Sequence, residues 1–178
     1  MESSVLNFQN NLKTLTFKTF YRNQTQQFDY DDLFADRRVL VFSIPIILGN
    51  FSVRQLKNFH NSYERLTGLG LDDIYCISSS DLLIGPWSAR HSGVVRGLPD
   101  MSCDFVKAIA TEFNFDKPIL HLSAFWQYMV IINNGQPEKF WQNPVKSNMQ
   151  WHMIKNKDYA YHGLTVEQVE KYLLDNSK

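Results

Sequence analysis

The sequence is poor in features that mark several common classes of protein. Only two of its 178 residues are cysteines, and Cys76 and Cys103 do not form a C-x-x-C pair. This pattern excludes a disulfide scaffold, and we expect both thiols to be reduced, with Cys76 buried in a strand. Neither sign of charge prevails, because 18 Lys+Arg balance 18 Asp+Glu. The balance predicts neither a nucleic-acid partner nor binding to an anionic membrane surface.

Long apolar runs are also absent from the sequence. No segment approaches the roughly 18 to 20 apolar residues of a membrane span. The stretch from Met1 to Asn11 has no basic residues followed by an apolar run, which is the pattern of a signal peptide. These absences predict no association with a membrane and a cytoplasmic location.

Motifs for common ligands do not occur either. The chain has no glycine-rich phosphate loop, no H-E-x-x-H zinc motif and no G-x-S-x-G nucleophile elbow. Its five histidines include no pair four residues apart, which makes a preformed metal site unexpected. We therefore expect no metal and no cofactor. The histidines are His60, His91, His121, His152 and His162.

The central pattern of the chain is a strand, a helix and a second strand. The apolar run Val39–Ile44 ends at Pro45 and is typical of a central strand, and Ile74–Ile77 is a second such run. From Val53 to Leu66, apolar residues recur at helical spacing before two glycines. A crossover of this length favours parallel pairing of the two strands and an α/β fold.

The flanking segments add further elements. We expect a strand at Leu15–Phe20, a polar loop at Tyr21–Gln27 and a helix following Ser102. A short helix and a strand near Val94–Leu98 are expected between Gly85 and Pro99.

The C-terminal third predicts a hairpin and a last helix. Tyr128–Ile132 and Pro137–Trp141 have strand character around the turn Asn133–Gly135. The last helix starts at Val166, with Thr165 as its N-cap. We expect one domain over residues 1–178, with an insertion at about Gln142–His162. Aromatic residues are frequent here and are expected mainly to pack a core, although they could line a ligand groove or partner surface. They are Trp126, Tyr128, Trp141, Trp151, Tyr159 and Tyr161.

Four segments between Leu15 and Trp141 resemble the peroxiredoxins, and in particular the peroxiredoxin-5-like subfamily. Phe28–Pro45 is similar to the family's approach to its active-site loop, and Cys76–Trp87 to its next strand and turn. Leu98–Phe105 resembles the L-x-D-P-x-G-x-F segment, and Tyr128–Gly135 the late strand and turn. The resemblance implies a thioredoxin-like fold, in which a central mixed sheet is flanked by helices. It also implies a homodimer.

The motif that carries the chemistry of this family is degenerate in the chain. The pattern P-x-x-x-T-x-x-C becomes a sequence in which Pro45 is retained, Gly49 stands for the threonine and Ser52 for the peroxidatic cysteine. Counting back eight residues from Gly135 places Gln127 where the family has its activating arginine. A serine hydroxyl has a far higher pKa than a thiol and is not readily oxidised to a sulfenic acid. We interpret Ser52 as a helix N-cap, with Gln55 three residues later.

Three interpretations of function stay open. The first is a non-catalytic peroxiredoxin-like module that acts through contacts with an unknown protein or through a small ligand in the former pocket. The second is a thiol-dependent peroxidase or reductase that uses a relocated cysteine. Cys103 is the better candidate, since we place it in the first turn of a helix that begins near Ser102, where the helix dipole stabilises a thiolate; Cys76 is the weaker one. The third is an unrelated activity in the Gln142–His162 insertion.

Overall fold

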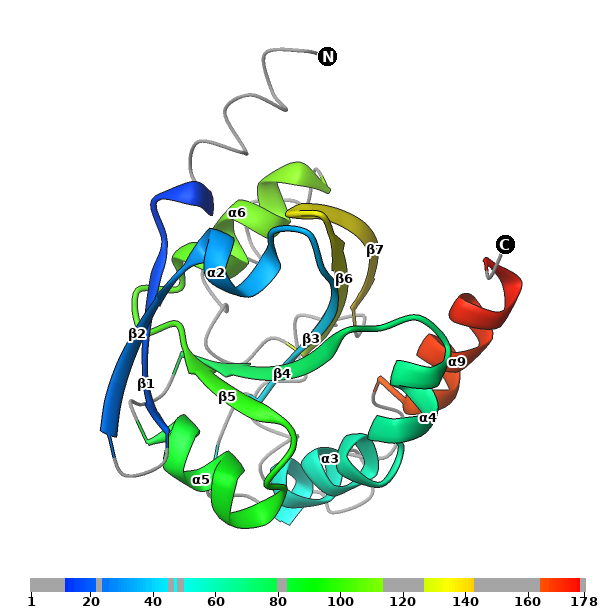
Figure 1. Ribbon diagram of the computed structural model, residues 1–178, viewed down its shortest axis with the longest axis horizontal. Coiled ribbons are helices and arrows are strands. Elements are labelled where there is room, and N and C mark those ends of the chain that lie inside the picture. Colours follow the sequence, from blue (N-terminus) through cyan, green and yellow to red (C-terminus); the bar gives the residue numbers. More distant parts are fainter. Residues whose placement is uncertain are drawn as a thin grey trace, which may run out of the picture.

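The computed structural model describes residues 12–21, 24–44, 47, 50–79, 83–113, 127–142 and 164–176. Among them, five strands form one sheet in the order β5-β4-β3-β6-β7 (Figure 1). The strands are β3 (Arg38–Ser43), β4 (Asp73–Ser78), β5 (Arg96–Pro99), β6 (Tyr128–Asn133) and β7 (Gln136–Gln142). The pair β3–β4 is parallel, with Leu40 opposite Ile74, whereas β3–β6 and β6–β7 are antiparallel. The predicted parallel crossover, the hairpin and the mixed sheet are confirmed.

Helices cover both faces of the sheet, because its strands carry buried apolar side chains on both sides. One face packs against α2 (Tyr30–Phe34), α6 (Asp104–Glu112) and β1 (Thr16–Tyr21), and we call it the α6 face. The opposite face, here the α3 face, packs against the helices α3 (Asn50–Asn61), α4 (Tyr63–Gly68), α5 (Ile84–His91) and α9 (Val166–Asp175). Figure 1 shows the two helical layers on either side of β3 and β4.

Aromatic packing fixes α3 on its face of the sheet. The ring of Phe42 in β3 stacks on that of Phe59 in α3, with a centroid distance of 4.2 Å. Leu56, one turn before Phe59, is fully buried. The inner face of α3 therefore runs through residues 52, 55, 56 and 59, all of which are buried, as helical periodicity requires.

The prediction of a polar loop at Tyr21–Gln27 is wrong. Residues Gln24–Asp29 form β2, which pairs antiparallel with β1 from Thr16 opposite Asp29 to Tyr21 opposite Gln24. Backbone hydrogen bonds to the strongly strand-forming β1 outweigh the weak intrinsic strand preference of the polar side chains. The same hairpin is tied to the main sheet, because the Thr19 hydroxyl donates to the carbonyl of Gly97 at 2.8 Å.

The predicted single helix from Val53 to Leu66 is two helices. The first begins earlier, at Asn50, and the break lies at Ser62, between α3 and α4. Asparagine and serine at positions 61 and 62 favour turns over a helix interior, which explains the break.

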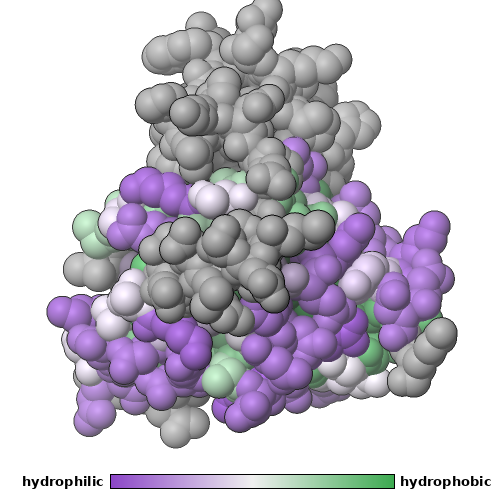
Figure 2. Space-filling model, turned by 90° about the horizontal axis from the view of Figure 1, so that it is seen from above, coloured by the Kyte–Doolittle hydropathy of each residue, from purple (hydrophilic) through white to green (hydrophobic). Residues whose placement is uncertain are grey.

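Among the described helices, none has the length and apolar character needed to cross a membrane. On the face shown in Figure 2, hydrophilic side chains predominate among the coloured residues.

Candidate functional site

Ser52 lies in the first turn of α3 and is 3% exposed. Because α3 begins at Asn50, Ser52 is inside the helix, and its interpretation as the N-cap is wrong. The physical reason is that Asn50 also favours a helix start, so that capping preferences alone could not choose between neighbouring positions. Ser52 faces the sheet in the same row as Leu56 and Phe59, so its hydroxyl points into the protein.

Gln55 adds a second buried polar group one turn further along α3. It is 6% exposed, and its side-chain oxygen Oε1 is buried without a hydrogen-bond partner among the described residues. An orphaned buried acceptor costs about 1–3 kcal/mol in protein stability. A donor placed beside Gln55, whether water or a ligand, would remove that cost.

Gln127 lies directly before β6 and is 7% exposed. It is held near the carboxyl end of β3, since the Tyr128 amide donates to the Ser43 hydroxyl at 2.8 Å. Alternation along β6 places position 127 on the same side as Met129 and Ile131, which pack on the α3 face. The structure thus places Ser52, Gln55 and Gln127 on one face, near the end of the sheet where β3 ends and β6 begins. We call these three residues the polar site.

The polar site contains neither a charged side chain nor a thiol. Its groups are one hydroxyl and two amides, which donate and accept hydrogen bonds but do not titrate near neutral pH. Such a set can hold a small uncharged polar molecule. Pro45 and Gly49, the other residues of the degenerate motif, lie outside the described residues.

Cys76 is located in β4 and is fully buried, as predicted. Burial raises the pKa of its thiol well above the ordinary value. A thiol in this environment stays protonated and is a poor nucleophile.

Cys103 lies at the N-cap of α6, one residue before the helix begins, and not in its first turn as predicted. Its backbone is left-handed, with φ 58°, and its amide donates to the carbonyl of Asp100 at 2.9 Å. The turn Asp100–Cys103 delays the start of the helix, which explains the difference from the predicted position. The side chain is partly buried against the core of the α6 face.

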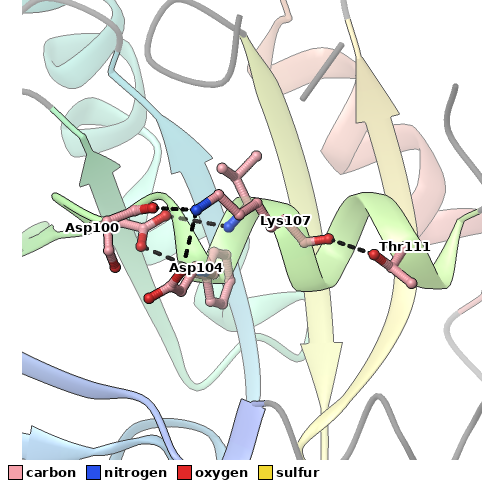
Figure 3. A network of polar contacts seen from close by, with 7 residues as sticks. Asp100, Asp104, Lys107 and Thr111 are labelled. Carbon is pink, nitrogen blue, oxygen red and sulfur yellow. Dashed lines mark hydrogen bonds and ion pairs between the residues drawn. The ribbon is translucent and has the colours of Figure 1, made fainter. Parts of the chain in front are cut away.

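The N-terminus of α6 already binds a carboxylate. The two oxygens of Asp100 accept hydrogen bonds from the amides of Phe105 and Val106, each at 3.2 Å. Burial raises the pKa of Asp100 above its ordinary value, although these amide hydrogen bonds lower it in part. Figure 3 shows Asp100 at the first turn of α6, with Asp104 and Lys107 beside it. The positive end of the helix dipole is therefore used by Asp100 and is not reserved for the sulfur of Cys103.

The region around Cys103 lies on the opposite face of the sheet from the polar site. Burial raises the pKa of Tyr128 well above its ordinary value, and the nearby Asp100 and Cys103 raise it further. Tyr128, Phe105 and Cys103 all belong to the core of the α6 face, whereas α3 packs on the other side. A thiol at position 103 thus lies on the other side of the sheet from position 52.

The structure describes only some of the remaining candidate residues that the sequence predicted. Within the described residues, no group of three or more His, Cys, Asp or Glu side chains could hold a metal ion. Of the C-terminal aromatic residues, Tyr128 is buried in the core as expected, and Trp141 packs at the edge of the core on the α3 face. Trp126, Trp151, Tyr159 and Tyr161 lie outside the described residues, as does the insertion after Gln142.

Sequence reasoning missed two polar features. Gln55 was assigned to a capping box, and only its burial shows that its oxygen lacks a partner. Asp100 was noted as part of a motif, but its role as the acceptor for α6 was not predicted. The signal for that role was an aspartate shortly before a helix, which is a common capping pattern.

The chain is similar in sequence to curated peroxiredoxins. No family model matches the chain. A curated peroxiredoxin of Rhizobium etli is 32% identical over 118 residues, which cover 63% of this chain and 64% of that protein. Peroxiredoxin y4vD of Sinorhizobium fredii is 25% identical over 115 residues, covering 63% and 61%. The chain thus matches less than two thirds of the length of these relatives.

Solved structures of peroxiredoxins share the fold over most of the chain. Reduced Prx3 of Vibrio vulnificus in complex with hydrogen peroxide has a TM-score of 0.66 and 17% identity, covering 91% of this chain and 92% of that one. The 1-Cys peroxiredoxin of Plasmodium falciparum has a TM-score of 0.65 and 19% identity, covering 91% and 95%. These identities carry the fold alone, which is the thioredoxin-like fold of the peroxiredoxins. The chain is therefore similar in sequence to curated peroxiredoxins over part of its length, and it shares the fold of solved peroxiredoxins.

Proposed function

We propose that this peroxiredoxin-like protein has lost thiol peroxidase activity and acts by binding. The observation that carries the proposal is Ser52, which occupies the buried first turn of α3, where the family resemblance puts the peroxidatic cysteine. Peroxide reduction requires a thiolate that attacks the peroxide, becomes a sulfenic acid and releases water. Serine at this position supplies no sulfur for that step.

Neither cysteine of the chain offers an obvious replacement. Cys76 is fully buried in a strand, with a raised pKa. Cys103 is only partly buried, which favours it as the alternative, a thiol-dependent peroxidase or oxidoreductase with a relocated nucleophile. Against that alternative, the adjacent helix N-terminus already accommodates the Asp100 carboxylate.

The peroxidase part of the proposal is tested by peroxide consumption. The purified protein is mixed with hydrogen peroxide, with either thioredoxin or glutathione as reductant, beside Cys103→Ser and Cys76→Ser. We expect the wild-type rate to be no higher than that of free cysteine and to be unchanged by either substitution. A faster rate that disappears in Cys103→Ser would establish the relocated-cysteine alternative instead.

The binding part rests on the uncharged polar site. Its orphaned acceptor, Gln55 Oε1, calls for a ligand with a hydrogen-bond donor, and the absence of charge at positions 52, 55 and 127 disfavours ionic ligands. A titration with acetamide, followed by NMR of the glutamine side-chain amides, should give a saturable shift at Gln55. Gln55→Leu should abolish the accompanying shift of the Gln127 side-chain amide, whereas the control Gln27→Leu, at an exposed position of β2, should keep the shift at Gln55. No saturable shift in the wild type would contradict this part.

The proposal also includes a homodimer, as the family resemblance implies, and an unidentified protein partner. Location in the cytoplasm is part of the same proposal.

A further inference from the structure

A pair of aromatic rings at the edge of the sheet surrounds a cation that belongs to the chain itself. Trp141 in β7 and Tyr172 in α9 meet edge to face, with a centroid distance of 5.5 Å and an interplanar angle of 89°. The Lys139 ammonium lies 5.8 Å from the centroid of Trp141 and 5.6 Å from that of Tyr172. Two perpendicular rings thus direct their faces toward one positive charge. We call Trp141 and Tyr172 the aromatic corner.

The strand geometry explains why these side chains meet. Lys139 pairs with Ile131 and Trp141 pairs with Met129, and both partners pack on the α3 face, which α9 covers. Tyr172 lies next to Leu173, which is buried in the same core. The corner is therefore built by the docking of α9 on β7, and its three side chains stay partly exposed to solvent.

A β-bulge places a carboxylate next to the corner. The register shifts between Ile131, which pairs with Lys139, and Ile132, which pairs with Pro137, so that Glu138 is the extra residue of β7. The Glu138 carboxylate accepts hydrogen bonds from Arg38, Asn133 and Tyr172. Burial raises the pKa of Glu138, but the bonds and charge of Arg38 more than offset this, so the pKa is lower than usual. Arg38 pairs with this carboxylate, so the attraction of the corner for a cation comes from the two ring faces.

The native ammonium fits the corner loosely. Its two distances lie close to the limit of about 6 Å within which a cation interacts with a ring face. A primary ammonium is compact and strongly hydrated, so that it loses much hydration when held against two rings. A nitrogen surrounded by methyl groups is larger, and it would contact both rings at the separation that the structure leaves.

We propose that the aromatic corner of Trp141 and Tyr172 is a binding site for a quaternary ammonium group, and that Lys139 occupies it as an intramolecular competitor. The site does not involve Ser52, Gln55 or Gln127, and it is independent of the proposed loss of peroxidase activity. Binding displaces the Lys139 side chain into solvent and leaves the covalent structure unchanged.

Choline is the probe for this site, and the uncharged isostere 3,3-dimethyl-1-butanol is its matched control. Both are titrated by calorimetry and by NMR of the tryptophan indole groups into the full-length chain. The variants are Lys139→Ala, which empties the corner, and Lys171→Ala, which removes an exposed lysine of α9 outside it. We expect Lys139→Ala to bind choline about fivefold or more tightly than the wild type, because the competitor is gone. Lys171→Ala should bind choline with the affinity of the wild type. The uncharged isostere should bind to none of the three proteins.

A second variant tests the rings themselves. Tyr172→Leu in the Lys139→Ala background should weaken choline binding about fivefold or more, while circular dichroism confirms that the protein is folded. If the substitution unfolds α9, the readout becomes the choline-induced shift of the Trp141 indole in Lys139→Ala, assigned with Trp141→Phe. Equal binding of choline by the wild type and Lys139→Ala, equal binding of the uncharged isostere, or no saturable binding to Lys139→Ala would each overturn the proposal.

Discussion

At the scale of single residues, the polar site consists of three buried side chains without charge. Ser52, Gln55 and Gln127 are each less than 10% exposed, with values of 3%, 6% and 7%. Their hydroxyl and amide groups carry no charge, so their burial costs far less than that of a thiolate and an arginine. These groups offer hydrogen bonds and no charge, so we expect that restoring peroxidase chemistry to the site requires more than one change.

The first prediction concerns the restoration of a thiol at position 52. Ser52→Cys should remain a poor peroxidase, because Gln127 provides no cation and Gly49 no hydroxyl to orient the peroxide. Adding Gly49→Thr and Gln127→Arg should raise the rate by about tenfold or more, since the three groups act on one transition state. Stopped-flow oxidation of the two variants measures this. A single variant as fast as the triple one would show that another group activates the thiol.

The second prediction concerns the pH dependence of stability at Asp100. Burial raises the pKa of this carboxyl above 3.8 in the folded protein, so the folded state binds more protons than the unfolded state between the two values. The resulting stabilisation is fully present below pH 3.8 and is lost as the pH rises through the folded pKa. Urea titrations give the free energies of unfolding of the wild type and of Asp100→Asn. The difference, wild type minus variant, should therefore fall as the pH rises across the acid range.

Asp104 provides the matched control for this experiment. Its pKa is lowered, chiefly by a hydrogen bond from Ser102, and so its contribution is present above 3.8 and lost as the pH falls. The difference between the wild type and Asp104→Asn should thus have the opposite slope. The same slope for both variants would contradict the assignment of a raised pKa to Asp100.

At the scale of elements, the β6–β7 hairpin depends on a turn whose backbone is left-handed at two successive residues. Asn134 has φ 51° and Gly135 has φ 71°. Asparagine tolerates this region and glycine adopts it freely, so the pair suits a two-residue hairpin turn. The turn is also tied to α2, since the Gly135 amide donates to Phe34 at 2.8 Å and the Tyr30 hydroxyl to Gly135 at 3.2 Å.

Replacing the turn glycine is the third prediction. Gly135→Ala should lower the free energy of unfolding by about 1–2 kcal/mol, because a Cβ is strained in the left-handed region. Gly68→Ala is the control, since Gly68 ends α4 and an added Cβ would meet no atom within 4 Å. That variant should be neutral or more stable by about 0.4–1 kcal/mol. Chemical denaturation measures both, and equal effects of the two substitutions would argue against strain at position 135.

At the scale of the whole molecule, the described residues form one sheet with a helical layer on each face. The arrangement places the polar site on the α3 face and Cys103 with the core of the α6 face. A single domain over residues 1–178 stays a prediction, because the Gln142–His162 insertion lies mostly outside the described residues. The separation of the two faces keeps the Cys103 thiol away from the polar site, whereas Cys76 shares the α3 face but is fully buried in β4.

Oligomeric state is the fourth prediction. We expect a homodimer, as the resemblance to the peroxiredoxins implies, because closed twofold dimers are the commonest assemblies of identical chains. Analytical ultracentrifugation over a hundredfold range of concentration should give twice the mass of one chain at the upper end. A single-chain mass throughout that range would contradict the expectation.

Elements whose signals are local and strong could be predicted from the amino-acid sequence. The strands β3 and β4, the helix after Ser102 and the Asn134–Gly135 turn were predicted and are present, whereas α3 and α4 were predicted as one helix. The capping box of α9, in which the Thr165 amide donates to the Gln168 side chain at 2.9 Å, was also recognised from spacing. These features depend on residues within one turn or strand, which a local pattern can report.

Features that depend on distant partners are seen only in the folded chain. β2 is a strand because β1 lies beside it, and Gln55 is an orphaned acceptor because the sheet buries it. Cys103 was expected in the first turn of α6, but it is the N-cap, and the Asp100 carboxylate accepts hydrogen bonds from the amides of that turn. The aromatic corner joins Trp141 and Tyr172 from segments 31 residues apart, counted from 141 to 172. Burial and hydrogen-bond satisfaction are properties of the packed chain, and no local pattern contains them.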